Sequence, residues 1–159
     1  TNSSAMFKKS VVLILFAANL FLAAKAQNEE DAVKAVINQL FTGMKTSDAN
    51  LVKACFTDSA VMQTIASNKQ GKLYVKDEKV QDFISSIAKL PKDSVDERIV
   101  FGNIKIEGVL ATVWTPYLFY YNNQFTHCGV DNFVLVKLNG GWKIQYLIDT
   151  RRKHGCDVK

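Results

Sequence analysis

Residues 110–152 read LATVWTPYLFYYNNQFTHCGVDNFVLVKLNGGWKIQYLIDTRR, three runs rich in β-branched and aromatic residues that two short polar segments separate. Such runs are typical of β-strands. Asn139-Gly140 is the strongest short signal for a β-hairpin, because both positions of its turn require positive φ, and Asn122-Asn123 is a weaker signal of the same kind. The stretch therefore predicts three long antiparallel strands, at residues 110–121, 124–138 and 141–152.

Two-residue turns would fix how these strands pair. Counting back from the turns places Asp131 between Trp114 on the preceding strand and Ile148 on the following one, and Leu118 opposite His127. Because side chains alternate between the two faces of a strand, one face should collect most of the large apolar residues and point inward. Its expected members are Leu110, Thr112, Trp114, Leu118, Tyr120, Phe125, His127, Asp131, Phe133, Leu135, Trp142, Ile144, Tyr146 and Ile148.

The opposite face is mixed, yet too apolar for an ordinary solvated surface. The apolar patch expected on it consists of Val113, Tyr117, Phe119, Val130, Val134 and Leu147. An exposed patch of this kind predicts a partner, and a two-fold homodimer is the commonest one. A bulge would exchange parts of the two faces, and we expect it near Pro116 and Gly129, where strands of this length bend.

Helical periodicity in the apolar residues precedes the strands. A first helix is expected to start at Asn28, and a third at Asp77, because both residue types are common N-caps. Ser47 or Asp48 caps a short second helix, and Pro91 ends the third. Shorter strands are expected at residues 60–65, 73–75 and 98–107. The sequence therefore predicts an α+β domain with three N-terminal helices on a long curved antiparallel sheet.

The N-terminal region has the features of a secretory signal peptide. A short basic segment at residues 6–9 precedes an apolar run, and Ala24-Lys25-Ala26 fits the pattern of a cleavage site. The run is short for a membrane span, which takes about 20 residues. We expect residues 1–5 to be upstream residues, 6–26 a cleaved signal peptide, and 27–159 a single domain that is secreted or periplasmic, with no stable membrane anchor.

The expected mature chain has 133 residues, the length of one domain. Removing the three lysines of the signal peptide from 20 basic residues leaves 17 against 15 acidic residues. This balance gives no reason to expect nucleic acid as a partner. Cys55 is expected to be a buried helix residue. In an oxidising compartment two cysteines could pair, and Cys128 with Cys156 is the favoured pair.

The order of elements resembles that of the nuclear-transport-factor-2-like superfamily, the cone-shaped α+β fold of SnoaL-like cyclases, ketosteroid isomerases and scytalone dehydratase. The resemblance rests on IEGVLATVW at residues 106–114, FTHCGVDNF at 125–133 and GWKI at 141–144, and it covers residues 29–152. It is nearest to the SnoaL-like or "putative lumazine-binding" branch. It implies a pocket between the sheet and the helices, but no particular activity, because the fold hosts many functions.

His127 and Asp131 are the candidate acid/base residues, about 13 Å apart along one strand of the inward face. Trp114 beside Asp131 would raise the pKa of that carboxyl by desolvation, as a general base in such a pocket requires. Alternatively, Asp131 only bonds a backbone amide or the indole, and His127 packs at the rim. Asp149 and Arg151 are expected to form a surface or interface pair. The expected pocket lining is Trp114, Leu118, Tyr120, His127, Asp131, Phe133 and Tyr146.

The sequence has no Ser-His-Asp order, Gly-rich phosphate loop, zinc spacing or calcium loop, so we expect no metal and no cofactor. The favoured function is binding of a small apolar or aromatic ligand without changing it. A second is that of a cofactor-independent isomerase, dehydratase or hydrolase using Asp131 or His127. A third is a dimeric assembly module without a ligand.

Overall fold

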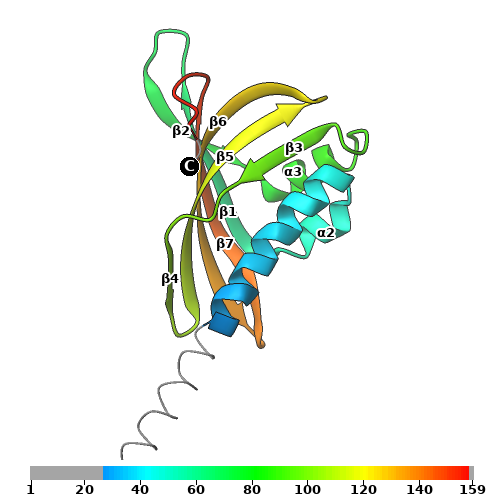
Figure 1. Cartoon of the computed structure of the whole chain (residues 1–159), viewed down its shortest axis with the longest axis vertical. Coiled ribbons are helices and arrows are strands. Elements are labelled where there is room, and N and C mark those ends of the chain that lie inside the picture. Colours follow the sequence, from blue (N-terminus) through cyan, green and yellow to red (C-terminus); the bar gives the residue numbers. More distant parts are fainter. Residues whose placement is uncertain (1–26, 158–159) are drawn as a thin grey trace, which may run out of the picture. The chain divides into compact units, whose positions relative to one another are not determined.

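The computed structural model describes residues 27–157 (Figure 1). These residues fall into two units that divide between Ala32 and Val33, and the description below concerns the second unit, apart from the start of the first helix. The expected signal peptide, residues 6–26, lies outside the described residues. Among the helices described, none has the length and apolarity that crossing a membrane requires.

The three expected helices are present within residues 27–157. They cover residues 27–46, Ala49–Lys53 (α2) and Val80–Ile87 (α3). Asn28 lies inside the first helix and does not cap it. Asp48 caps α2 as expected, because its side chain accepts hydrogen bonds from two backbone N–H groups at 3.0 and 2.9 Å. Asp77 does not cap α3 but lies in the strand before it.

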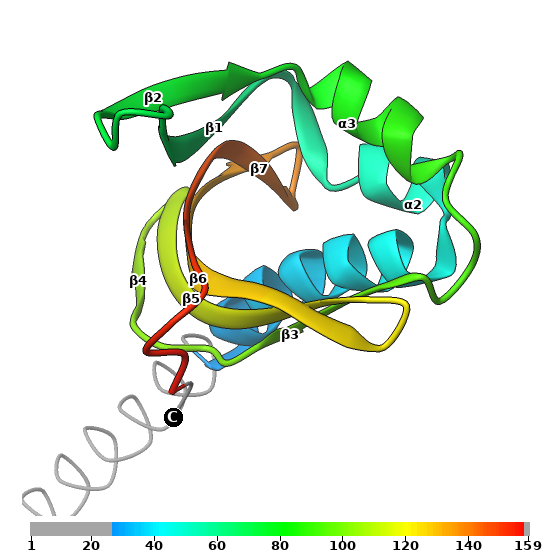
Figure 2. The ribbon, with the colours of Figure 1, turned by 90° about the horizontal axis from the view of Figure 1, so that it is seen from above.

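Within the described part of the chain, seven strands form one sheet. They are β1 Phe56–Ser67, β2 Leu73–Glu78, β3 Val95–Ile99, β4 Ile104–Glu107, β5 Leu110–Tyr121, β6 Gln124–Leu138 and β7 Gly141–Arg152. The order is β2-β1-β7-β6-β5-β3, with β4 beside β5, and only the β1–β7 pair is parallel. The sheet is strongly curved, and α2 and α3 lie on its open side (Figure 2).

Both hairpins pair as expected next to their turns and then shift by one residue. Thr126 on β6 has no partner on β5, and Gln145 on β7 has no partner on β6. Each is a β-bulge, in which one extra residue displaces the pairing of everything beyond it. The expected bulge position is therefore wrong, because Pro116 and Gly129 lie within a regular part of the β5–β6 ladder.

The bulges place Trp114 and Asp131 on opposite faces of the sheet, so the expectation that they share a face is wrong. Trp114 pairs with Asn132 and is 49% exposed. Asp131 pairs with Thr115 and Asp149 and is only 5% exposed. The inward residues of β5, β6 and β7 include Ala111, Val113, Thr115, Tyr117, Asp131, Phe133, Leu135, Trp142, Ile144, Leu147 and Asp149.

The surface expected to form the homodimer is wrong for four of its six residues, and only Val130 and Val134 face away from the core. Val113 and Tyr117 are 0% and 1% exposed, so they belong to the core. On β5, the face turned away from the core carries Leu110 and Trp114 instead, which are 50% and 49% exposed.

The expected disulfide between Cys128 and Cys156 is present, with the two Cα atoms 5.7 Å apart. It ties the segment after β7 to the middle of the sheet. Cys55 is buried as expected, although it follows α2 and is not within the helix. Burial raises the pKa of its thiol to about 11, so the thiol stays protonated and unreactive at neutral pH.

Candidate functional site

A cavity of about 290 Å³ lies between the concave face of the sheet and the helices. Its apolar lining is Leu40, Phe41, Met44, Met62, Phe83, Ile87, Leu90, Val95, Phe119, Phe133 and Leu147. The first helix and α3 contribute only apolar side chains, because each turns its apolar stripe toward the sheet. Phe41 meets Phe133 edge to face, with ring centres 6.2 Å apart, and this contact closes one part of the wall.

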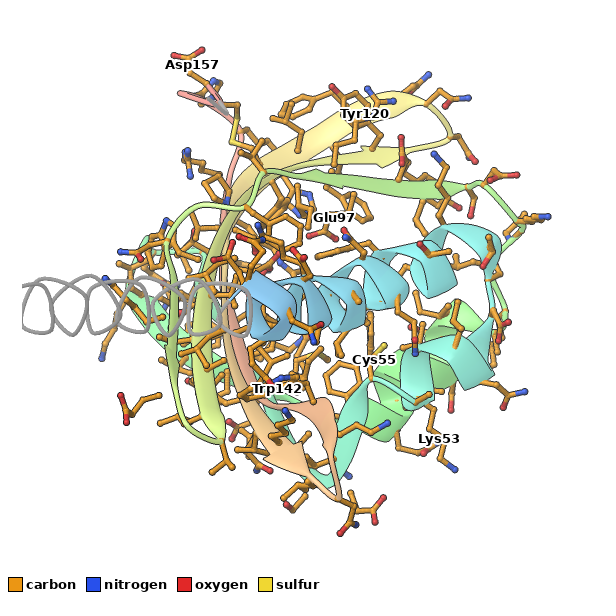
Figure 3. All side chains as sticks on the ribbon, turned by 60° about the horizontal axis from the view of Figure 1, so that its bottom comes forward. Lys53, Cys55, Glu97, Tyr120, Trp142 and Asp157 are labelled. Carbon is orange, nitrogen blue, oxygen red and sulfur yellow. A yellow bond between two sulfur atoms is a disulfide. The ribbon has the colours of Figure 1, made fainter. Side chains whose placement is uncertain are left out.

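The polar groups of the cavity come from the sheet. They are Gln63 on β1, Glu78 on β2, Glu97 on β3, Tyr117 on β5, His127 and Asp131 on β6, and Asp149 and Arg151 on β7. The register explains why some of them gather, since Asp131 lies directly opposite Asp149 on the neighbouring strand. Glu97 is on the side of β3 that faces the first helix, whereas Tyr120 lies on the other side (Figure 3).

The carboxyl groups of Glu97 and Asp131 both line the polar end of the cavity, and each affects the ionisation of the other. Burial raises the pKa of Glu97 to about 8, and the negative charge of Asp149 adds to the effect. Burial likewise raises the pKa of Asp131 well above its ordinary value, followed by the charges of Glu97 and Asp149. Two such acids cannot both ionise readily, so the pair holds a proton at neutral pH.

Asp149 is stabilised by different partners. The Nε atom of Arg151 donates to its Oδ2 at 2.7 Å, and the Tyr117 hydroxyl lies 3.3 Å from the same oxygen. The hydroxyl also donates to the backbone oxygen of Thr150 at 2.9 Å. Burial raises the pKa of Tyr117 far above its ordinary value, so it remains a neutral donor.

Gly129 allows Tyr117 to reach across β6 to β7. A Cβ atom at this position would lie 1.7 Å from the Thr150 backbone oxygen and 2.8 Å from Cε1 of Tyr117. A glycine within a strand marks a close approach of this kind. The tyrosine hydroxyl thereby reaches Asp149 from two strands away.

His127 lies against two rings beside the acidic groups. It stacks on Phe119, with ring centres 4.8 Å apart, and meets Tyr117 edge to face at 5.7 Å. Burial lowers the pKa of His127, and the positive charge of Arg151 lowers it further. The imidazole is therefore neutral at neutral pH and could accept or donate a hydrogen bond.

Of the expected pocket residues, His127, Asp131 and Phe133 line the cavity. The other four are not part of its lining, namely Trp114, Leu118, Tyr120 and Tyr146. Because of the bulge at Thr126, the β5 residues among them face away from His127 and Asp131, and the bulge at Gln145 has the same effect on Tyr146. Tyr120 lies under the guanidinium of Arg98, 4.0 Å from it, and the Tyr146 hydroxyl donates to Gln63 at 2.6 Å.

Glu97, Tyr117, Asp149 and Arg151 were not expected in the pocket. Tyr117 is on β5, and Asp149 and Arg151 are on β7, two strands on which the bulges decide which residues face inward. The expected surface position is wrong for Asp149, which is buried, whereas the Arg151 side chain lines the cavity and is still 48% exposed. The position of Glu97 in the cavity could have been predicted from the sequence. It is an acid in a short strand beside Val95, and both line the cavity because alternate residues share a face.

The comparisons with known proteins concern the family and the fold. A family model described as "Putative lumazine-binding" matches residues 28–146. The chain belongs to this family. No curated protein matches it.

Solved structures show the same fold. An NTF2-like protein with a cystatin-like fold from Novosphingobium aromaticivorans has a TM-score of 0.68 at 10% identity, covering 87% of this chain and 91% of that one. NTF2-like proteins of unknown function from Shewanella baltica and Methylobacillus flagellatus have TM-scores of 0.64 and 0.61 at 18% and 21% identity. Both matches cover 79% of this chain, and they cover 94% of the Shewanella baltica chain and 93% of the Methylobacillus flagellatus chain. The expected nuclear-transport-factor-2-like fold is confirmed.

Proposed function

We propose that this protein is exported and binds a small, largely apolar or aromatic molecule in the cavity without changing it. The observation that carries the proposal is the cavity, whose volume of about 290 Å³ is near the lower end of ordinary ligand sites. Its apolar walls would bury a ring system, and the polar residues at one end would orient it. The family description points the same way, since lumazine is a flat bicyclic heteroaromatic molecule.

Binding can be tested with lumazine and a small set of one- and two-ring compounds, followed by ligand-observed NMR and calorimetry. Leu90→Trp should fill part of the cavity and weaken binding about tenfold or more, because Leu90 lines it. Leu138→Trp is the matched control, since Leu138 is 52% exposed and lies outside the lining. If no ring compound binds at millimolar concentration, or both variants behave alike, the binding proposal fails.

Export is supported by the pattern of residues 6–26 and by the disulfide between Cys128 and Cys156, because disulfides persist in oxidising compartments. N-terminal sequencing of the protein from an exporting host should give Gln27 as the first residue. Recovery of a chain that retains Met6 in the exported fraction would contradict the proposal.

A second candidate is a cofactor-independent isomerase, dehydratase or hydrolase, and the raised pKa of Asp131 in the cavity favours it. The two candidates differ in what Asp131→Asn does. An enzyme that used this carboxyl as general base should lose at least about a hundredfold in turnover of any substrate found. A pure binder turns nothing over in either form.

A homodimer also belongs to the proposal, through the outer face of β5. Leu110 and Trp114 are about half exposed there, and a two-fold contact would cover them. Light scattering at micromolar concentration should give a dimer, and Trp114→Ser should give a monomer. A monomeric unaltered protein would rule this interface out.

A further inference from the structure

The charges that line the cavity are unequal. Four carboxyl groups line it, from Glu78, Glu97, Asp131 and Asp149, against the single guanidinium of Arg151. The Lys76 ammonium pairs with Glu78 at 2.9 Å, and Arg151 pairs with Asp149 at 2.7 Å. These two pairs leave Glu97 and Asp131 as the acids without a cation partner.

Asp131 also has an oxygen that no described group satisfies. Its Oδ2 is buried and accepts no hydrogen bond from any residue that the structure describes, although the side chain lines the cavity. Two nearby donor atoms point elsewhere, since the Tyr117 hydroxyl donates to Thr150 and the Arg151 Nε to Asp149. A buried acceptor left open is unfavourable, so this oxygen needs either a proton or a donor from a ligand.

We propose that the cavity recognises a small organic cation, an apolar or aromatic body that carries a protonated nitrogen and donates from it to Asp131 and Glu97. The apolar body would lie against the side chains of the first helix and α3, and the nitrogen would lie at the sheet end. The inference rests on the proposed binding function and adds the charge of the ligand.

The geometry distinguishes this cation from other charged ligands. Among residues 27–157, no group of three or more His, Cys, Asp or Glu side chains is arranged to hold a metal ion. An anion would have to approach the carboxyl groups of Glu97 and Asp131, and the guanidinium of Arg151 already pairs with Asp149. An organic cation fits both the excess of carboxyl groups and the large share of apolar wall.

Binding would exchange one cation for another. In the free protein the Glu97–Asp131 pair holds a proton, and the protonated nitrogen of the ligand would take its place. Affinity should therefore rise with pH, by up to about tenfold per pH unit, until the pair ionises unaided. The charged and titratable groups facing the pair are Glu78 on β2, Tyr117 on β5, His127 on β6, and Asp149 and Arg151 on β7. Neutral His127 and Tyr117 do not change charge between about pH 7 and 8, because their pKa values are lowered and raised respectively.

The test uses probes that differ only in charge: phenethylamine with 2-phenylethanol and 3-phenylpropionate, and tryptamine with tryptophol. Calorimetry on the mature protein at about pH 8 should show the amine of a pair binding about tenfold or more tightly than the alcohol. Calorimetry in two buffers of different ionisation enthalpy should show a proton released at about pH 6.5.

Glu97→Gln and Asp131→Asn should each remove the preference for the amine and leave binding of the alcohol within about threefold, which also shows that the variants fold. Asp96→Asn is the matched control. Asp96 is on the same strand, but it pairs with Lys45 and Arg98 at 2.9 and 2.8 Å and is not part of the cavity lining. This variant should keep the full preference.

The outcomes separate the two proposals. Alcohols that bind as tightly as the amines, or a carboxylate that binds more tightly than both, would overturn the cation while leaving the binding function standing. An amine preference that survives Asp131→Asn and Glu97→Gln would also overturn it. Failure of every probe to bind at millimolar concentration would overturn the binding function itself.

Discussion

Replacing Asp131 with Asn should stabilise the protein more at pH 8 than at pH 5. Glu97 and Asp131 have raised pKa values, so the folded protein keeps a proton that the unfolded chain releases. The free energy of unfolding therefore falls as pH rises from the ordinary pKa of Glu97, 4.5, through its folded pKa of about 8. Over that whole interval the loss is on the order of 5 kcal/mol.

Asn at position 131 removes one acid of the pair and can donate a hydrogen bond to Glu97. Of the free energy of unfolding that the unaltered protein loses between pH 5 and pH 8, the variant should retain about 2 kcal/mol. It should still lose the rest, because Glu97 remains buried. Urea unfolding of both proteins at the two pH values measures this difference. Asp96→Asn is the control, because the pKa of Asp96 is lowered and its ion pairs are present at both pH values. Equal effects of Asp131→Asn at pH 5 and 8 would refute the shared proton.

Two further changes test the packing. Gly129→Ala should lower the free energy of unfolding in urea by about 3 kcal/mol or more, because its Cβ would collide with the Thr150 oxygen. Gly141→Ala should be nearly neutral, because its Cβ would have its nearest neighbour at 3.9 Å. Similar losses in both variants would contradict the close approach at Gly129. Replacing both Cys128 and Cys156 with Ser should lower the free energy of unfolding by about 3–4 kcal/mol, because the unfolded chain regains the entropy of a loop with a sequence separation of 28. An unchanged urea midpoint would show that the bridge does not restrict the unfolded chain.

The sequence was informative where local chemistry is decisive. Asn122 and Asn123 both have positive φ, as does Asn139, and the turns they form start both hairpins in the expected register. Asp48 caps α2 because its side chain accepts hydrogen bonds from backbone N–H groups of the same helix, an interaction between neighbours in the sequence. The disulfide partners were also identified correctly, since Cys55 is buried apart from the other two cysteines.

The site was harder to predict, because it depends on the positions of two β-bulges, each a single residue without a partner on the neighbouring strand. Counting from a turn assumes an unbroken ladder, and one extra residue reverses the facing of every residue beyond it. Thr126 and Gln145 carry no glycine or proline signal that marks them as bulges. The β6 residues beyond Thr126 were assigned to the correct face, which includes His127, Asp131 and Phe133, whereas Phe125 and the β5 residues were assigned to the wrong one.

The same two bulges decide the chemistry of the cavity. Without Gln145 as an extra residue, β7 would present Ile148 beside Asp131, and the cavity would have an aliphatic side chain there in place of Asp149. With the bulge, Asp149 and Arg151 face inward, and the field of Asp149 raises the pKa values of both Glu97 and Asp131. Arg151 neutralises only the acid that it pairs with. The pair of Asp149 and Arg151 adds no net charge, so the excess of negative charge that should select a cation comes from Glu97 and Asp131. The backbone register adds the charge of Asp149 beside them, which helps that pair to keep its proton.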